Sequence, residues 1–165
     1  MRRHLELQGL RRGVHVRRLL LSLVAVVPVL ALFNLFGQRP GTATANTSSA
    51  RLSVYSPAAL RGGLLFTSRF HVTARKDIHK ALLVLDPGWI EDMQVNSITP
   101  EPRSAGSRDG RIVLDLGPIA AGHSVITFIE FQVNPTNLGH RSQDVELDDG
   151  SRRLLHIERS VTVFP

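Results

Sequence analysis

Residues 64–74, with the sequence LLFTSRFHVTA, decide the fold of this chain. Apolar or small side chains occupy every second position, among them Phe66 and Phe70, while polar side chains such as Arg69 and His71 fall between them. Because successive side chains of a β-strand point to opposite faces, a period of two predicts a strand with one buried and one solvated face. The stretch therefore predicts a half-buried strand at the surface of a β protein.

The same period recurs through the rest of the carboxyl-terminal region. Residue pairs that favour turns, such as Asp109-Gly110 and Asp149-Gly150, separate the apolar runs. The expected strands are 52–55, 64–74, 81–85, 93–98, 112–116, 125–133, 143–147 and 154–164. Seven to eight short strands of this kind predict an all-β domain over residues 51–165, folded as an antiparallel sandwich of two sheets.

One segment of this domain, LDLGPIAAGHSVITF at residues 114–128, carries a family resemblance. A strand ends in Leu116-Gly117, a short connection carries Ile119 and Gly122, and the next strand opens at Val125. This order resembles the conserved-repeat, immunoglobulin-like modules of bacterial cell-surface proteins. The resemblance implies that the sandwich is immunoglobulin-like.

Two shorter segments are similar to other parts of the same modules. Residues 83–88, LVLDPG, resemble the segment in which an acidic residue and Pro-Gly close a hairpin, and residues 161–165 resemble the last strand. Such modules serve as spacers, adhesins and assembly parts, so the resemblance implies a fold and no activity. The chain has one copy rather than an array, which disfavours a spacer.

The glycines of the resembling segment also have a physical reason. Gly117 and Gly122 fall where the chain is expected to reverse between strands, and glycine adopts a positive φ there without steric cost. A phosphate-binding glycine loop would need a following helix and usually a lysine, and this segment has neither. We therefore interpret the loop as structural.

An apolar run at residues 19–36, LLLSLVAVVPVLALFNLF, precedes the β region and contains no charged residue. At about 1.5 Å per helical residue it would span about 27 Å, close to the hydrocarbon thickness of a bilayer. Six arginines and one glutamate give residues 1–18 a charge of +5. The run predicts one transmembrane signal-anchor helix, with the basic segment 1–18 cytoplasmic and the carboxyl-terminal domain extracytoplasmic in the cell membrane.

Charge and cysteine content exclude several classes of protein. The chain has a net charge of +6, of which only +1 belongs to residues 19–165, so the domain lacks the basic surface that nucleic-acid binding requires. It contains no cysteine, which excludes disulfides, zinc–thiolate sites and a lipoprotein anchor. The fold must therefore be stabilised by its core alone.

Residues 37–50 join the apolar run to the β domain and consist largely of Gly, Thr, Ala, Ser and Asn. This composition predicts a flexible linker. Ala43-Thr44-Ala45 also resembles a signal-peptide cleavage site, and cleavage after Ala45 would release a secreted domain. The length of the apolar run favours a retained anchor.

Residues with chemically useful side chains form no recognisable site. The five histidines of the domain, His71, His79, His123, His140 and His156, lack the spacing of paired metal ligands. Residues 144–149 contain four carboxylates but not the full spacing of a calcium loop. We expect no metal, no cofactor and no small-molecule substrate.

A serine hydrolase is the one catalytic class for which the sequence offers a neighbouring pair. Ser124 follows His123, but adjacent residues of a strand point to opposite faces and cannot form the hydrogen bond that activates a nucleophile. We therefore expect that the chain is not an enzyme.

Four apolar residues are candidates for a partner surface: Leu65, Trp89, Ile126 and Phe128. Trp89 follows a turn, where it is either a hot spot or a core residue at the end of the sandwich. Ile126 and Phe128 belong to a strand that is apolar on both faces, and Leu65 to the stretch at 64–74.

These observations lead to a functional hypothesis. The chain is predicted to be a membrane-anchored, non-catalytic protein-binding or accessory subunit of a membrane complex, with the bilayer and one protein as partners. The alternatives are an adhesin or cell-wall-contacting domain, or a secreted binding domain after cleavage.

Overall fold

The computed structural model describes residues 3–33 and 38–164. The chain divides into two compact units, one from Met1 to Gly37 and the other from Gln38 to Pro165. In the described residues the first unit is one helix and the second contains the strands. The second unit begins at Gln38, rather than at residue 51 as the composition predicts.

Helix α1 runs from Arg3 to Leu32 and contains Pro28. Within it, the eighteen residues Gly13–Leu30 are long and apolar enough to cross a membrane, with a mean hydropathy of 1.7. Their apolar side chains are largely exposed, which is unfavourable in water and favourable in lipid. The prediction of one apolar amino-terminal helix is confirmed. Of the expected anchor at 19–36, residues 34–36 lie outside the described residues.

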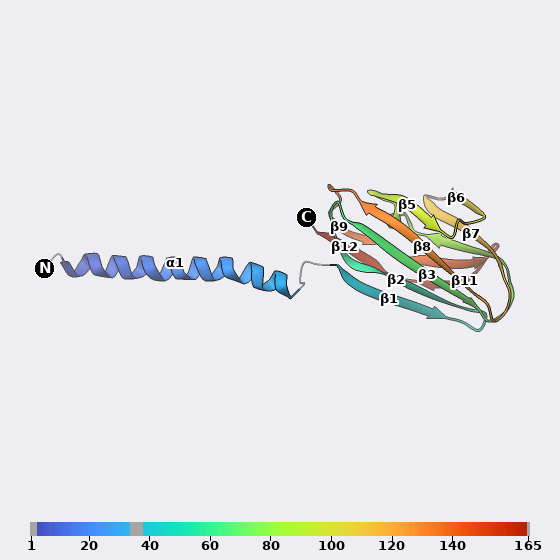
Figure 1. The fold of residues 1–165 in the computed structure, drawn as a ribbon, viewed down its shortest axis with the longest axis horizontal. Coiled ribbons are helices and arrows are strands. Elements are labelled where there is room, and N and C mark those ends of the chain that lie inside the picture. Colours follow the sequence, from blue (N-terminus) through green and yellow to red (C-terminus); the bar gives the residue numbers. More distant parts are fainter. Residues whose placement is uncertain (1–2, 34–37, 165) are drawn as a thin grey trace. The chain divides into compact units, whose positions relative to one another are not determined.

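The strands and one short 3₁₀ turn follow in chain order (Figure 1). They are β1 (Arg39–Asn46), β2 (Ala50–Arg61), β3 (Leu65–Ala74), β4 (Ile78–Leu85), η1 (Pro87–Trp89), β5 (Met93–Thr99), β6 (Ser104–Arg108), β7 (Arg111–Ile119), β8 (Ser124–Val133), β9 (Gly139–Ser142), β10 (Val145–Asp149), β11 (Arg152–Ile157) and β12 (Ser160–Phe164). A seven-stranded sheet has the order β5-β8-β3-β2-β12-β9, with β1 paired to β2, and a five-stranded sheet has the order β11-β10-β4-β7-β6. The prediction of a mostly β protein with two sheets is confirmed.

The strands differ from the expected ones in number and direction. The described residues form twelve strands rather than seven to eight. Strands β6 and β9 have the sequences SAGSR and GHRS, which lack the apolar alternation by which strands are recognised. Strand β12 pairs with β2 in parallel, whereas an antiparallel sandwich was expected.

Strand β1 corrects the prediction of a flexible linker over residues 37–50. It pairs with β2 along its whole length. Ala43 and Ala45 pack against the core, and the polar residues that alternate with them, Thr42, Thr44 and Asn46, are exposed. Pairing with a long neighbouring strand and burial of small side chains outweigh the weak strand propensity of Gly and Ala. The connection between α1 and β1 is consequently six residues, 33–38.

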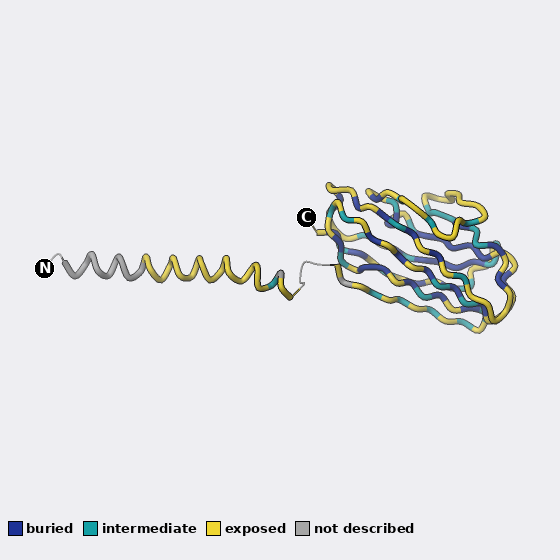
Figure 2. Tube along the Cα trace, in the orientation of Figure 1, coloured by how far each residue is buried: buried dark blue, intermediate teal, exposed yellow. Residues whose placement is uncertain are grey.

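The two sheets share one hydrophobic core, seen as the buried segments that alternate with exposed ones along the strands in Figure 2. Strand β3 shows the burial predicted for residues 64–74, with Phe66 and Phe70 inside and Leu65 and Arg69 outside. The five-stranded sheet contributes Leu83, Leu85, Leu114 and Leu147 to the same core.

Gly117 and Gly122 both have the predicted positive φ, +81° at each. Gly122 lies in the turn between β7 and β8. Gly117 instead lies within β7, opposite Ala81, where the β4–β7 register shifts, and its amide donates a 2.8 Å hydrogen bond to Asp115 Oδ1. Gly117 therefore forms a β-bulge rather than the expected turn.

The expected strand at 154–164 is broken where the chain passes from the five-stranded to the seven-stranded sheet, between β11 and β12. Arg159 lies at this crossing. Its guanidinium donates to Gln143 Oε1 at 2.8 Å and to the Pro57 carbonyl at 3.1 Å, and Cζ lies 4.8 Å from the centre of the Trp89 ring. Burial lowers the pKa of Arg159 to about 10, so the side chain stays charged at neutral pH.

Candidate functional site

The outer face of the seven-stranded sheet carries exposed apolar side chains on neighbouring strands. Strand alternation turns them outward, and 50% of Leu65, 43% of Phe128 and 40% each of Ile126 and Tyr55 are exposed. Exposed apolar side chains on neighbouring strands of one face make this face a candidate interaction surface. We call this surface the Phe128 face and define it by Tyr55, Leu65, Arg69, Ile126, Phe128 and Glu130.

An arginine lies between two aromatic residues in the central row of the Phe128 face. The register places Tyr55 opposite Arg69 and Arg69 opposite Phe128, across strands β2, β3 and β8. Arg69 Cζ lies 5.4 Å from the centre of the Tyr55 ring, a cation–π contact. In the adjacent row Ile126 lies opposite His71. The central row, Tyr55–Arg69–Phe128, thus combines the side-chain types that are enriched at protein interfaces.

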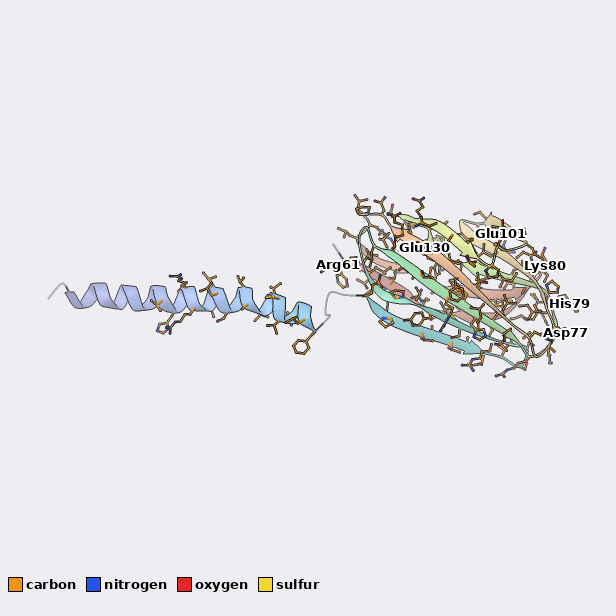
Figure 3. The ribbon with its side chains drawn as sticks, viewed as in Figure 1. Arg61, Asp77, His79, Lys80, Glu101 and Glu130 are labelled. Carbon is orange, nitrogen blue, oxygen red and sulfur yellow. The ribbon has the colours of Figure 1, made fainter. Side chains whose placement is uncertain are left out.

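Two charged residues of the Phe128 face have no ion-pair partner in the described part of the chain. Neither Arg69 nor Glu130 lies within 4.0 Å of an oppositely charged group there. Glu130, labelled on β8 in Figure 3, accepts one long hydrogen bond of 3.4 Å from Ser97 Oγ. Both charges are therefore available to an outside partner.

A shallow pocket lies at one end of this face. Gln94 and Gln132 lie opposite each other on β5 and β8, and both line the pocket together with Asn134. Gln132 is also opposite Leu65. This end of the face therefore offers amide donors and acceptors beside an exposed apolar side chain.

Trp89, a candidate partner residue in the sequence, does not belong to the Phe128 face. It is fully buried, and the centre of its ring lies 5.3 Å from those of Phe70 and Phe131. Its Nε1 donates to the Asp144 carbonyl at 3.2 Å. The 3₁₀ turn η1 directs the indole into the end of the core, which confirms the core alternative for Trp89 and removes it from the candidate partner surface. Leu65, Ile126 and Phe128 remain.

His123 and Ser124 each have other partners. Ser124 Oγ shares a 2.9 Å hydrogen bond with Thr73 Oγ1 on β3, and His123 Nδ1 lies 3.3 Å from the Ala121 carbonyl. The neighbouring pair that the sequence singled out is therefore engaged in contacts that fix the ends of β3 and β8.

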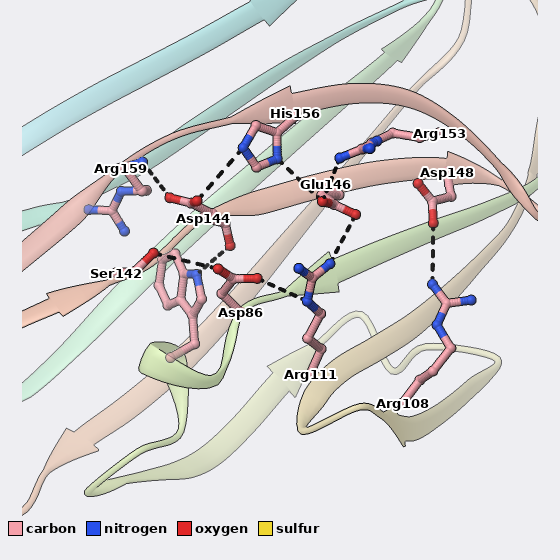
Figure 4. A network of polar contacts seen from close by, with 11 residues as sticks. Asp86, Arg108, Arg111, Ser142, Asp144, Glu146, Asp148, Arg153, His156 and Arg159 are labelled. Carbon is pink, nitrogen blue, oxygen red and sulfur yellow. Dashed lines mark hydrogen bonds and ion pairs between the residues drawn. The ribbon is translucent and has the colours of Figure 1, made fainter.

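The outer face of the five-stranded sheet carries a set of ion pairs centred on Glu146, which we call the Glu146 network (Figure 4). Glu146 Oε1 lies 3.0 Å from Arg153 Nη1, and Oε2 lies 3.2 Å from Arg111 Nη1. Arg111 Nε also lies 3.2 Å from Asp86 Oδ1. These contacts join strands β7, β10 and β11 to the end of β4.

Asp148 extends the Glu146 network toward the β6–β7 hairpin. Its side chain is only 7% exposed, Oδ2 lies 3.5 Å from Arg108 Nη2, and Oδ1 is buried without a hydrogen-bond partner in the described residues. Burial, followed by the neighbouring charge of Glu146, raises the pKa of Asp148. The Asp148 carboxylate therefore ties the hairpin to β10 at a cost in desolvation.

Each carboxylate at 144–149 has a side-chain partner in the described residues, an arginine for Glu146, Asp148 and Asp149 and a histidine for Asp144. His156 lies between two of them, with Nδ1 3.4 Å from Glu146 Oε1 and Nε2 3.7 Å from Asp144 Oδ2. Within the described residues, no group of three or more His, Cys, Asp and Glu residues could hold a metal ion. The contacts that the Glu146 network makes between strands explain why these charged side chains lie together.

Three residues of the Phe128 face, Tyr55, Arg69 and Glu130, were not singled out from the sequence. Alternation placed Arg69 and Glu130 on polar strand faces, which are ordinarily solvated. These residues come together because β2, β3 and β8 are neighbours in the sheet. The order of strands in a sheet cannot be read from a single sequence.

No protein-family model and no curated protein matches this sequence. Among solved structures, the chain is similar to one described by the words "AvmM Catalyzes Macrocyclization in Alchivemycin A Biosynthesis". The TM-score is 0.47 and the sequence identity 11%, over 76% of this chain and 97% of that chain. A likeness at this level assigns no residue, substrate or activity to this chain.

The comparison nevertheless corrects one expectation. The sequence predicted that the chain is not an enzyme, whereas the similar structure is that of AvmM, a catalyst of macrocyclization. The prediction relied on the absence of familiar motif spacings, and one fold can carry many unrelated activities. We therefore withdraw the prediction that the chain is not an enzyme.

Proposed function

We propose that this chain is a single-pass membrane protein whose outer domain binds another protein as an accessory subunit of a membrane complex. Helix α1 lies in the bilayer of the cell membrane, with the arginine-rich amino end on the cytoplasmic side. The domain is an immunoglobulin-like sandwich outside the membrane, an assignment that two sheets around one shared core support.

The Phe128 face is the observation that carries the proposal. It places the exposed Tyr55, Ile126 and Phe128 in one face, together with an arginine stacked on one of the aromatic rings. Aromatic and arginine side chains dominate the binding energy of protein interfaces. A sheet face of this composition fits a protein surface better than a small molecule, which binds in a concave site.

The short connection supports a partner in or at the membrane. Residues 33–38 join helix α1 to β1, and six extended residues reach only about 20 Å. A domain tethered this closely is within reach of a partner that spans or adheres to the same membrane.

The test is recovery of the partner with full-length protein from native membranes. Wild type and the Ile126→Asp/Phe128→Asp double variant would be purified in detergent, and co-isolated proteins quantified by mass spectrometry. We expect one partner in stoichiometric amount with the wild type, counted either as a different membrane protein or as a differently tagged copy of this chain. The variant should recover at least about tenfold less of it, because charges replace two apolar residues in the centre of the face.

The control is Leu138→Asp, which places the same charge at another exposed apolar position, 49% exposed and outside the face. It should retain the partner. Retention of the partner by the double variant would rule out this surface. A purified wild-type protein that begins at Asn46 would contradict the anchored state and favour a secreted, wall-binding domain.

A further inference from the structure

The Phe128 face is complementary to itself, and we propose that its partner is a second copy of this chain, packed face to face about a two-fold axis. The inference rests on the proposed function, because it names the partner of the same surface. A two-fold contact uses one patch on both copies, so each favourable pair across it occurs twice.

The register of β3 and β8 supplies the geometry. Arg69 lies opposite Phe128 and Thr67 opposite Glu130, so that these four outward residues form the corners of one cell of the sheet. The cell measures about 4.8 Å across the strands and about 6.8 Å along them. Arg69 and Glu130 occupy one diagonal, and Phe128 and Thr67 occupy the other.

A two-fold axis that lies in the plane of the interface and crosses the Arg69–Glu130 diagonal at its midpoint and at right angles brings Arg69 of each copy to Glu130 of the other. In a cell of these dimensions the same axis passes within about 2 Å of Phe128. Phe128 therefore packs against its own counterpart at the centre of the contact, with one Arg–Glu pair on either side of it.

The charges favour a second copy over an unrelated protein. In the described residues Arg69 and Glu130 lack ion-pair partners, although they lie on adjacent strands of one face. An exclusively acidic partner would leave Glu130 opposed by like charge, and an exclusively basic one would leave Arg69 opposed in the same way. A second copy satisfies both. The pairs fix orientation, and the apolar residues supply most of the affinity.

A charge-swap experiment tests this arrangement. Full-length copies with two different epitope tags are co-expressed, extracted from membranes and captured through one tag, and the other tag is quantified. When both copies carry Arg69→Glu, the introduced glutamate faces Glu130 at both contacts. When both carry Glu130→Arg, the introduced arginine faces Arg69 at both contacts. We expect each variant to self-associate at least about tenfold less than the wild type.

The mixed pair decides the question. The copy with Arg69→Glu has an acid at both positions, and the copy with Glu130→Arg has a base at both. In the two-fold register each contact takes one residue from each copy. The first contact then joins the introduced glutamate to the introduced arginine, and the second joins the native Arg69 to the native Glu130. Both contacts are again between opposite charges, and capture should return to the wild-type level.

Recovery confined to the mixed pair also excludes misfolding of either variant. Matched controls are Lys76→Glu and Glu158→Arg, which reverse a charge at exposed positions outside strands β2, β3 and β8 and should have no effect. Loss of association in these controls would show that net charge, rather than the proposed pairs, governs the contact.

Three other outcomes would overturn the inference in distinguishable ways. Self-association of both single variants at the wild-type level would place the contact elsewhere, for example in helix α1. In the second outcome, wild-type copies fail to associate while a different protein co-purifies with the wild type and is lost from the Ile126→Asp/Phe128→Asp variant. That result would reject a second copy as the partner and retain the proposed function. No association and no lost protein would reject both.

Discussion

Trp89 closes one end of the core, where its ring contacts two buried aromatic rings and the guanidinium of Arg159. Arg159 in turn donates to the Pro57 carbonyl of β2 and to Gln143. One buried indole therefore holds η1, strand β2 and the crossing between the sheets together. Its removal would leave a large cavity and a buried cation without its aromatic neighbour.

Trp89→Ala is expected to lower the free energy of unfolding by about 3–5 kcal/mol. Urea titration of the full-length protein in detergent, followed by circular dichroism of the strands, measures the change. Trp89→Phe keeps an aromatic ring and should cost less. A loss below about 1 kcal/mol for Trp89→Ala would contradict the core role, since it is typical of surface positions.

Asp148→Asn is expected to stabilise the domain at neutral pH. Burial raises the pKa of Asp148 above 3.8, so the folded state binds the proton more tightly than the unfolded state does. The wild type therefore loses stability as the pH rises from 3.8 through the folded-state pKa, while the asparagine does not titrate.

The stability difference between the two proteins should be largest above the folded-state pKa of Asp148 and should close as the pH falls toward 3.8. Thermal midpoints recorded from about pH 3 to about pH 8 measure it. A wild type that is more stable than Asp148→Asn at neutral pH would show that the Arg108 ion pair outweighs the desolvation of the carboxylate.

At the scale of the elements, two segments approach closely at Gly88. A Cβ at this position of η1 would collide with the backbone carbonyl of Ser142, the last residue of β9. With any side chain at residue 88, η1 and β9 could not pack this closely. The glycine is therefore required by packing rather than by its φ.

Gly88→Ala is expected to destabilise the protein by about 1–3 kcal/mol, the usual cost of overpacking. Gly106→Ala in β6 is the matched control, because a Cβ there meets nothing within 4 Å. It should change stability by no more than about 0.5 kcal/mol. Equal effects of the two substitutions in urea unfolding would disprove the close approach.

Predictability from sequence differed among the elements for physical reasons. The apolar alternation at 64–74 was sufficient to predict β3 and its buried face. Strands β1, β6 and β9 have little or no such alternation and exist because a neighbouring strand offers its hydrogen bonds.

The same distinction holds for the candidate site. Leu65, Ile126 and Phe128 could be proposed from apolar residues on both faces of a strand, and the structure exposes all three. The Arg69–Tyr55 contact and the diagonal of Arg69 and Glu130 depend on strand order and register, which are long-range properties. Trp89 was ambiguous because no periodicity applies to a 3₁₀ turn.

At the scale of the whole molecule, the apolar stretch Gly13–Leu30 should determine where the protein resides. Leu21→Arg/Leu23→Arg places two charges near its middle, each costing about 2.5–3.5 kcal/mol on insertion. We expect the fraction that resists alkaline extraction from membranes to fall sharply, while Thr42→Arg on β1 leaves it unchanged. Equal membrane retention of both variants would contradict an anchor in this stretch.

Strand β1 is the element through which a force on the anchor would reach the domain. Since β1 is the first element after residues 33–38, any pull on the anchor enters the domain at Arg39. The hydrogen bonds between β1 and β2 run across the strands, so tension along β1 strains the whole ladder together, whereas tension across it opens the bonds one after another. The force needed to strip β1 from the domain should therefore depend on the direction of the pull.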